Sequence, residues 1–135
     1  MTNITQVLRQ ERNMATMNTG ILAASLDQLL DQEGPFTVFV PSDLAFGKLE
    51  RGVWPNLLLS ENKTRLTDIL AHHIVRGKVS FGQLKDGARL TAVQGNELQV
   101  QVLAGVVTIN GATVQNRDVT ASNGVIHSLD AVLLN

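Results

Sequence analysis

The residues with the most chemical potential in this chain are three histidines, His72, His73 and His127. Histidine often binds transition metals, but a metal site needs several such side chains converging on one point. His72 and His73 are adjacent, so their side chains diverge on a helix or a strand, and His127 lies far along the chain. Neither a His-x-His nor a His-Glu-x-x-His spacing occurs. The spacing therefore predicts no metal site, and no other pattern predicts a cofactor.

Motifs that carry catalysis are also missing from the sequence. No serine lies in a Gly-x-Ser-x-Gly turn of the kind that exposes a nucleophile. The chain has neither a Gly-x-x-x-x-Gly-Lys loop nor a Gly-x-Gly-x-x-Gly turn for binding phosphate. It contains no cysteine, which excludes disulfides, thiolate catalysis and cysteine-based metal sites. The sequence therefore predicts a protein that is not an enzyme.

The composition indicates a single globular domain over residues 1–135, with 44% hydrophobic and 17% charged residues. The formal net charge is -1, and no stretch concentrates Lys or Arg, which argues against electrostatic binding of nucleic acid or anionic lipid. No apolar run approaches the roughly 20 residues that a transmembrane helix needs. Residues 1–20 are polar and lack the apolar core of a secretory signal. Two alternatives stay open, an intracellular protein and a mature extracellular domain.

The first third of the chain, and one later segment, have the apolar spacing of helices. One apolar stripe consists of Leu22, Leu26, Leu29 and Leu30 and predicts a helix. Thr19 is its predicted cap, and Gly34-Pro35 is its predicted end. A second helix is predicted from about Ser60 to His72, with an apolar face made of Leu66, Ile69 and Leu70. His73 continues that face, so we expect a buried ring with a hydrogen-bond partner.

Short strands are predicted after the first third of the chain, and they dominate the pattern from residue 74 onward. Residues 36–40 predict a buried strand, which Pro41 ends and after which Ser42 or Asp43 caps a short helix. Apolar and polar residues alternate over 98–102, and Asn110-Gly111 predicts a hairpin turn. A last strand, predicted over 125–134, is apolar on both faces and is therefore expected to be central. Helices followed by many short strands predict an α+β fold, or a β-sandwich with helices along one edge.

Three segments of the sequence resemble the signature blocks of the fasciclin family. They are residues 34–46 (GPFTVFVPSDLAF), residues 70–78 (LAHHIVRGK) and residues 123–134 (NGVIHSLDAVLL). Their order and spacing also fit the family, and the resemblance runs from about Asn3 to the end of the chain. It implies a single fasciclin-like domain, a wedge-shaped β-sandwich of short strands with several helices packed along one edge.

The resemblance also implies a function. It predicts a cell-adhesion or protein-interaction module, extracellular or at the cell surface, that binds a receptor or a matrix protein without catalysis. An alternative on the same fold is a carrier of a carotenoid-like apolar ligand, because some fasciclin-like proteins bind such pigments. A carrier would need an open apolar groove.

A short segment before the closing strand is the first candidate for partner binding. Asn116-Arg117-Asp118-Val119-Thr120 resembles an Asn-Lys-Asp-Ile-Leu pattern that is assigned to integrin binding in adhesive members. An exposed Asp118 carboxylate could complete the coordination of a divalent cation in a receptor. Thr120 departs from the pattern and removes one apolar group. The alternative is that Asp118 lies in a turn and bonds its own backbone.

The pair His72-His73 is the second candidate. It matches a Tyr-His element of the family, which is also assigned to adhesion, with His in place of Tyr. The alternative for His73 is a structural role on the buried face of its helix. Trp54, followed by Pro55, predicts either an exposed aromatic anchor for a partner or a partly buried plug.

Overall fold

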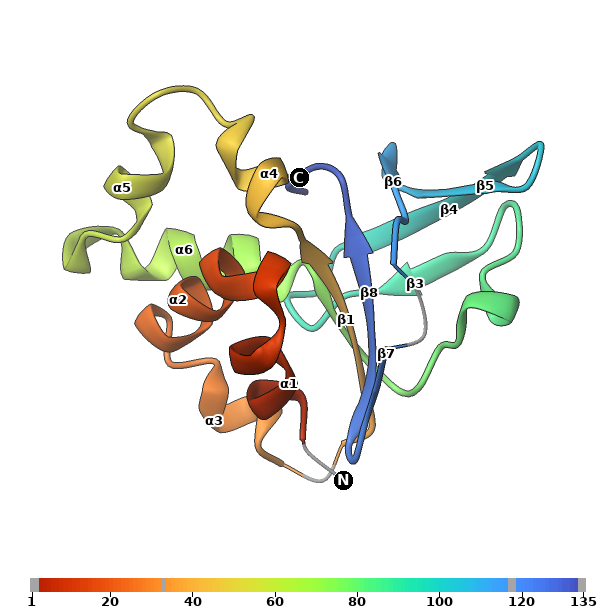
Figure 1. Cartoon of the computed structure of the whole chain (residues 1–135), viewed down its shortest axis with the longest axis horizontal. Coiled ribbons are helices and arrows are strands. Elements are labelled where there is room, and N and C mark those ends of the chain that lie inside the picture. The colour runs from red at the N-terminus through yellow and green to blue at the C-terminus, as the bar shows by residue number, and fades with distance from the viewer. Residues whose placement is uncertain (1–2, 33, 117–118, 134–135) are drawn as a thin grey trace.

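The computed structural model describes residues 3–32, 34–116 and 119–133. Its α-helices gather on one side of the molecule and most of its strands on the other (Figure 1). The α-helices are α1 (Ile4–Gln10), α2 (Ala15–Ala23), α3 (Asp27–Leu30), α4 (Asp43–Gly47), α5 (Val53–Leu57) and α6 (Lys63–Ala71). Short 3-10 helices are η1 (Arg12–Met14), η2 (Ser60–Asn62) and η3 (Phe81–Gln83). Among the described helices, none has the length and apolar character needed to cross a bilayer.

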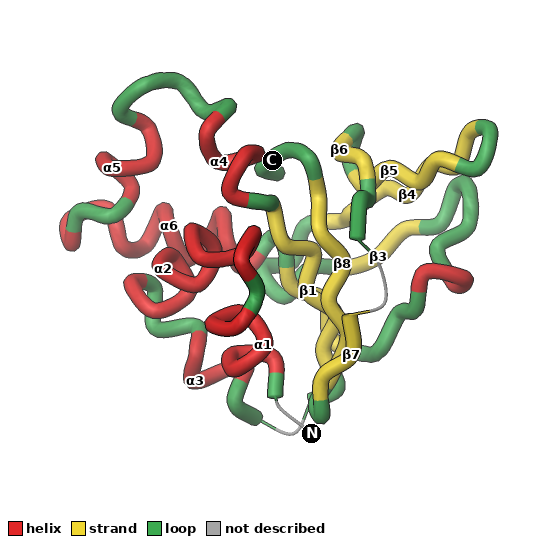
Figure 2. The backbone as a smooth tube through the Cα atoms, in the orientation of Figure 1, coloured by secondary structure: helices red, strands yellow, loops and turns green. Residues whose placement is uncertain are grey.

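The described strands form two sheets. They are β1 (Phe36–Pro41), β2 (Ile74–Arg76), β3 (Arg89–Thr91), β4 (Glu97–Leu103), β5 (Val106–Ile109), β6 (Ala112–Thr113), β7 (Val119–Ala121) and β8 (Gly124–Leu129). Their orders are β2-β1-β8-β7 and β3-β4-β5-β6. The sheets touch through two isolated bridges, Val75 to Ala92 and Val114 to Leu129. Figure 2 shows the α-helices on one side of β1 and β8 and the second sheet on the other, together with the short helix η3. The predicted α+β class, a sandwich with helices along one side, is confirmed.

Strand β1 divides the interior into two hydrophobic cores. Phe36, Val38 and Val40 face the helices and belong to the first core. Phe39 points the opposite way and belongs to the second core, between the two sheets. Side chains of a strand alternate between its faces, so a strand that is buried on both must be apolar throughout. β1 is buried along its whole length, and its neighbour β8 is likewise buried, which confirms the predicted central position of the closing strand.

The prediction of one helix with a leucine face was wrong in its boundaries and its face. α2 begins before Thr19, whose hydroxyl donates to the carbonyl of Ala15 and caps nothing. The helix ends at Ala23, and Ser25 has a φ of 60°, which breaks the chain before α3. Leu22 is 53% exposed, whereas Met17 and Ile21 are buried. The left-handed backbone at Ser25 separates α2 from α3, so the four leucines do not lie on one face of one helix.

Boundaries differ elsewhere by a few residues. The segment from Ser60 opens as the 3-10 helix η2 without a side-chain cap, and α6 begins only at Lys63. The closing strand was predicted to reach Leu134, but β8 ends at Leu129. Helix ends depend on local hydrogen bonds that the apolar pattern does not encode.

Asn123 ties the start of the chain to the central sheet. Its side-chain oxygen accepts from the backbone N–H of Ile4 at 3.0 Å. Its amide nitrogen donates to the carbonyls of Leu30 and Gln32. Its own carbonyl accepts from the N–H of Phe36 at 2.9 Å. One buried side chain therefore satisfies backbone groups at the start of α1 and after α3, where helix ends leave them without partners.

Ser42 is the N-cap of α4, which confirms one of the two predicted alternatives. Its removal should therefore lower the stability of the fold. Its hydroxyl accepts from the N–H of Ala45 at 3.2 Å. Ser42→Ala is expected to lower the free energy of unfolding by about 1 kcal/mol, because this N–H loses its acceptor. Urea denaturation measures the change, and Ser42→Asp should keep most of the wild-type stability. Equal midpoints for Ser42→Ala and the wild type would contradict the assignment of the cap.

Candidate partner-binding site

The segment predicted to bind a partner is held to the central strand β8 on both sides. Asn116 is exposed, and its backbone N–H donates to the hydroxyl of Ser128 at 2.8 Å. The N–H of Ser128 donates back to the carbonyl of Asn116 at 2.7 Å. Val119 is half-buried in β7, pairs with Ile126 of β8 and packs against the first core. The described ends of the segment are therefore fixed on one of the most buried strands of the fold.

Two of the predicted site residues, Arg117 and Asp118, lie outside the described residues. Thr120, the residue that departs from the family pattern, is exposed in β7 and pairs with Val125. It adds no apolar group to the core, so the substitution places a hydroxyl at the surface.

His73 is fully buried and makes two hydrogen bonds. Its Nε2 accepts from the backbone N–H of Leu133 at 2.9 Å, so the proton of the neutral ring lies on Nδ1. Nδ1 then donates to the carbonyl of Ile69, 2.9 Å away. The carbonyl of His73 itself accepts from the N–H of Phe39 in β1. The ring thus joins α6 to the C-terminal segment, in agreement with the structural alternative.

The environment of His73 favours the neutral ring. Burial lowers the pKa of His73 from 6.5 to about 4, because the charged ring would lose its hydration. The bond to the carbonyl of Ile69 opposes this shift, and the neighbouring His72 adds to it. His73 is therefore uncharged at neutral pH, as its acceptor role towards Leu133 requires.

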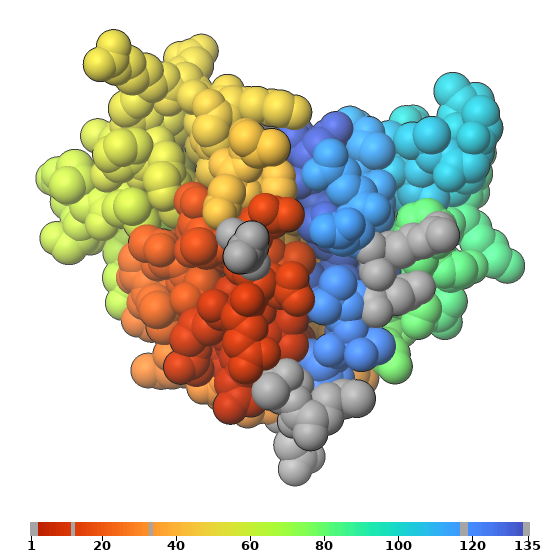
Figure 3. Space-filling model, viewed as in Figure 1, coloured from red at the N-terminus to blue at the C-terminus, as the bar shows by residue number. Residues whose placement is uncertain are grey.

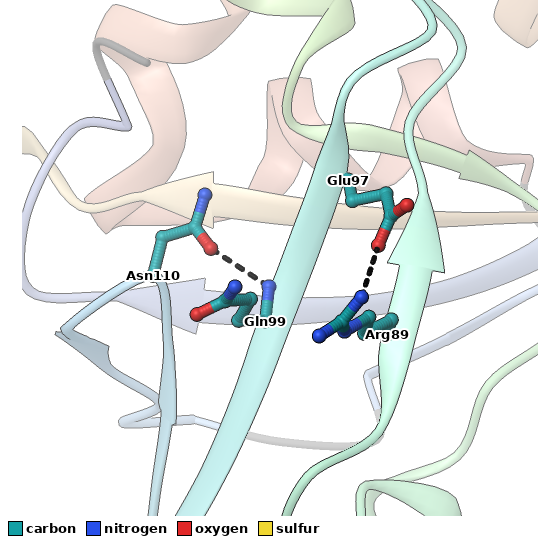
Figure 4. A network of polar contacts seen from close by, with 4 residues as sticks. All are labelled: Arg89, Glu97, Gln99 and Asn110. Atoms are coloured by element: carbon teal, nitrogen blue, oxygen red, sulfur yellow. Dashed lines mark hydrogen bonds and ion pairs between the residues drawn. The ribbon is translucent and has the colours of Figure 1, made fainter.

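His72 is also buried, at 2% exposure, but its hydrogen bonding is incomplete. Figure 4 shows Asn110 accepting from the N–H of Gln99 through its side-chain oxygen, at 2.7 Å. The amide nitrogen of Asn110 consequently faces Nε2 of His72, 3.4 Å away. The proton of His72 is then on Nδ1, which is buried and lacks a hydrogen-bond partner among the described residues. A buried donor without a partner costs about 1–3 kcal/mol.

Because both rings are buried, His72 and His73 are not part of the described surface. His72 lies against the chain that leads to the candidate segment, whereas His73 lies against Leu133. Asn110, which contacts His72, lies in the turn between β5 and β6. The next strand, β6, is bonded to the end of the closing segment, because Asp130 accepts from the N–H of Thr113 at 2.8 Å. The contact with Asn110 had no signal in the sequence, because Asn110 was read only as a turn residue.

The remaining aromatic and histidine side chains have packing roles. The ring of His127 stacks on Phe39, with centroids 5.6 Å apart, and its Nε2 donates to the carbonyl of Val79 at 2.8 Å. Trp54 is half-buried against Phe46, with centroids 4.6 Å apart, so it fits the description of a plug. Within residues 3–32, 34–116 and 119–133, no group of three His, Cys, Asp or Glu side chains could hold a metal ion.

A broad, open groove of about 860 Å³ runs along α6. Its apolar part comes from Leu26, Ala71 and Val93, and its rim is polar and carries charges of both signs. Its volume falls within the range of small-molecule sites, about 300–1,000 Å³.

Comparison with known proteins supports the resemblance in the sequence. The Fasciclin domain family model matches residues 12–135. The chain belongs to the fasciclin family. It is 42% identical over 131 residues to the protein sll1483 of Synechocystis sp., a match that covers 97% of this chain and 72% of that protein. The fasciclin domain is also 32% identical to a segment of transforming growth factor-beta-induced protein ig-h3 of Sus scrofa, covering 98% of this chain but 19% of that one.

The fasciclin fold of the chain is matched among solved structures. A FAS1 domain pair from the insect cell adhesion molecule Fasciclin I superposes with a TM-score of 0.86 at 23% identity. The match covers 99% of this chain and 51% of that one. At this identity the likeness establishes the fold, which is the predicted fasciclin fold.

Proposed function

We propose that this fasciclin domain is a cell-adhesion or protein-interaction module at the cell surface or outside the cell. It binds a receptor or a matrix protein and catalyses no reaction. The observation that carries the proposal is the family match over residues 12–135, together with a fold shared with a domain pair of an insect cell adhesion molecule. Proteins that share a fold can differ in function, so the residues that contact the partner must be identified in this chain.

The proposed contact is the segment Asn116-Arg117-Asp118-Val119. The anchoring of Asn116 and Val119 on β8 supports this choice, because binding segments work best on a rigid scaffold. The proposed contribution of His72 and His73 is indirect, because His73 joins α6 to the C-terminal segment and His72 contacts Asn110.

Asp118→Ala is expected to weaken attachment of cells or matrix from the source organism at least tenfold. The reason is the loss of a carboxylate that contacts the partner, which at the centre of an interface costs about 2 kcal/mol or more. The measurement is attachment to the immobilised domain at a series of coating densities. Asp68→Ala is the matched control, because Asp68 is an exposed carboxylate on α6 and its loss changes the net charge equally.

Attachment that is lost in Asp118→Ala and kept in Asp68→Ala supports the site. Attachment kept by both variants retains the adhesion module but removes this segment from the contact. No attachment by the wild-type domain contradicts the adhesion function itself.

A second candidate function is the carrying of an apolar small molecule. The groove along α6 favours it, since its size suits such a ligand and Leu26, Ala71 and Val93 line it. Protein purified from its native source should then show a visible absorption band if the ligand is a pigment. Val93→Asp should remove the band, because Val93 is a half-buried residue of the groove, and a colourless native protein would count against a pigment carrier.

A further inference from the structure

The hairpin of β4 and β5 ends in an exposed apolar tip. Leu103 is 80% exposed and Val106 is 49% exposed, and they are direct cross-strand partners. Ala104 and Gly105 form the turn between them. Figures 1 and 3 show this hairpin as a projection at one end of the molecule, away from the helices. We call residues 103–106 the hairpin tip.

The backbone of the hairpin tip would suit a polar residue better. Ala104 has a φ of 52° and Gly105 a φ of 81°, the left-handed values of a two-residue hairpin turn in which Asn-Gly is favoured. The next hairpin of the same sheet has this favoured pair, Asn110 at 48° and Gly111 at 87°. Alanine is disfavoured in the left-handed region. The chain thus keeps an apolar residue at the tip where asparagine would stabilise the turn.

Polarity along the solvent face of the hairpin increases in steps away from the tip. Behind Leu103 and Val106 lies the uncharged polar pair Gln101 and Thr108. Gln99 follows on the same face. Among the residues of β4 itself, a charge appears only at the far end, where Glu97 pairs with Arg89 of β3 at 3.8 Å (Figure 4). At about 3.4 Å per residue this end lies roughly 20 Å from the tip.

The sequence of the hairpin has no charge at all. Residues 98–116 contain no Asp, Glu, Lys, Arg or His. One anion from outside the hairpin lies beside it, because the carboxylate of Asp86 accepts from the N–H of Val102, next to Leu103, at 3.0 Å. Lys85 precedes Asp86 in the sequence, so these two residues together add no net charge. Leu44 provides a contrast, because it is 82% exposed but follows the charged residue Asp43 in α4. It therefore does not belong to an uncharged stretch of chain.

We propose that the hairpin tip inserts shallowly into the surface of a lipid bilayer without net charge. The order apolar, uncharged polar, charged follows the polarity of a bilayer from its acyl boundary through the headgroups to water. A protein partner fits less well, since a stable interface needs about 800 Å² from each side and the tip offers two exposed aliphatic side chains. Lipids rearrange around a small tip and need no matched surface. Attraction to anionic lipid needs clustered Lys or Arg, which the hairpin lacks.

Flotation with phosphatidylcholine vesicles tests the proposal on the whole chain. The wild-type protein is expected to partition onto vesicles weakly and reversibly, as small apolar anchors do. The double variant Leu103→Gln, Val106→Thr should bind at least tenfold less, whereas the matched variant Leu44→Gln should bind as the wild type. Binding should also persist from about 0.1 M to about 1 M salt, because no charge attraction contributes. Wild-type protein that does not float, or a double variant that floats equally, overturns the proposal.

A site-specific label locates the inserted residues. The chain has no cysteine, so Ala104→Cys can carry a single polarity-sensitive fluorophore, and Glu50→Cys provides a matched exposed site elsewhere. Vesicles are expected to shift the emission of the label at position 104 to the blue and to leave the label at position 50 unchanged. Equal shifts at both positions, or none at position 104, overturn insertion by the tip. The proposal does not depend on the adhesion site, because Asp118→Ala should bind vesicles as the wild type does.

Discussion

Gly124→Ala is expected to destabilise the fold by about 3 kcal/mol or more, the largest effect of any single methyl group considered. Gly124 pairs with Phe36 in the parallel β1–β8 ladder. A Cβ at this position would collide with the backbone carbonyl oxygen of Phe36 and would lie 2.9 Å from Cδ1 of Ile4. A carbonyl in a central ladder cannot move aside without breaking the ladder. Thermal unfolding should show a fall in Tm of roughly 10 °C.

Gly47→Ala is the matched control for this prediction. A Cβ at Gly47 in α4 would meet no atom within 4 Å, and alanine favours a helix. This variant should keep or slightly raise the Tm, by the equivalent of up to about 1 kcal/mol. If the two alanine variants melt together, the close approach of β1 and β8 at Gly124 is contradicted.

Acid is expected to destabilise the protein through His73. The unfolded chain binds a proton at this ring near pH 6.5, whereas burial holds the pKa of His73 in the fold at about 4. Between these values the unfolded state binds more protons, so the free energy of unfolding falls as the pH is lowered. The contribution is complete above about pH 6.5 and decreases by about 3 kcal/mol by pH 4. Urea unfolding at pH 7, 6 and 5, at a constant salt concentration, measures the slope.

His73→Gln isolates this contribution. Glutamine can donate to Ile69 and accept from Leu133, but it does not titrate. Between pH 6.5 and pH 5, the free energy of unfolding of the variant should fall by about 2 kcal/mol less than that of the wild type. This difference does not depend on the absolute stability of the variant. Parallel slopes for the two proteins would assign the acid sensitivity to other groups.

Much of the fold could be predicted from local patterns. The alternation over β4, the aromatic run of β1 and the Asn110-Gly111 turn each depend on neighbouring residues, and all three are confirmed. The burial of His73 was also predictable, because it continues the apolar face of α6. The break between α2 and α3 was not, since the left-handed Ser25 has no local signal comparable to glycine.

Contacts between distant segments were beyond the reach of the sequence patterns. The spacing of apolar residues shows that β8 is central but not that it runs parallel to β1. Likewise, the hydrogen bonds of Asn123 to α1 and to the end of α3 join segments far apart in the chain. In the candidate site, Asn116 and Val119 are bonded to or paired with residues of β8, and the assignment of Asp118 as the contact stays a prediction for the attachment assay.

The parallel pairing of β1 and β8 affects the order in which the chain can fold. During synthesis, residues 36–41 emerge long before residues 124–129, so β1 has no partner on its β8 side until nearly all of the domain exists. Antiparallel β2 can pair with the other side much earlier. Closing so long a loop slows folding, because its entropy is lost before the pairing stabilises it. Until then Phe36 and Val38 depend on early helix packing to stay out of water and out of contact with other nascent chains.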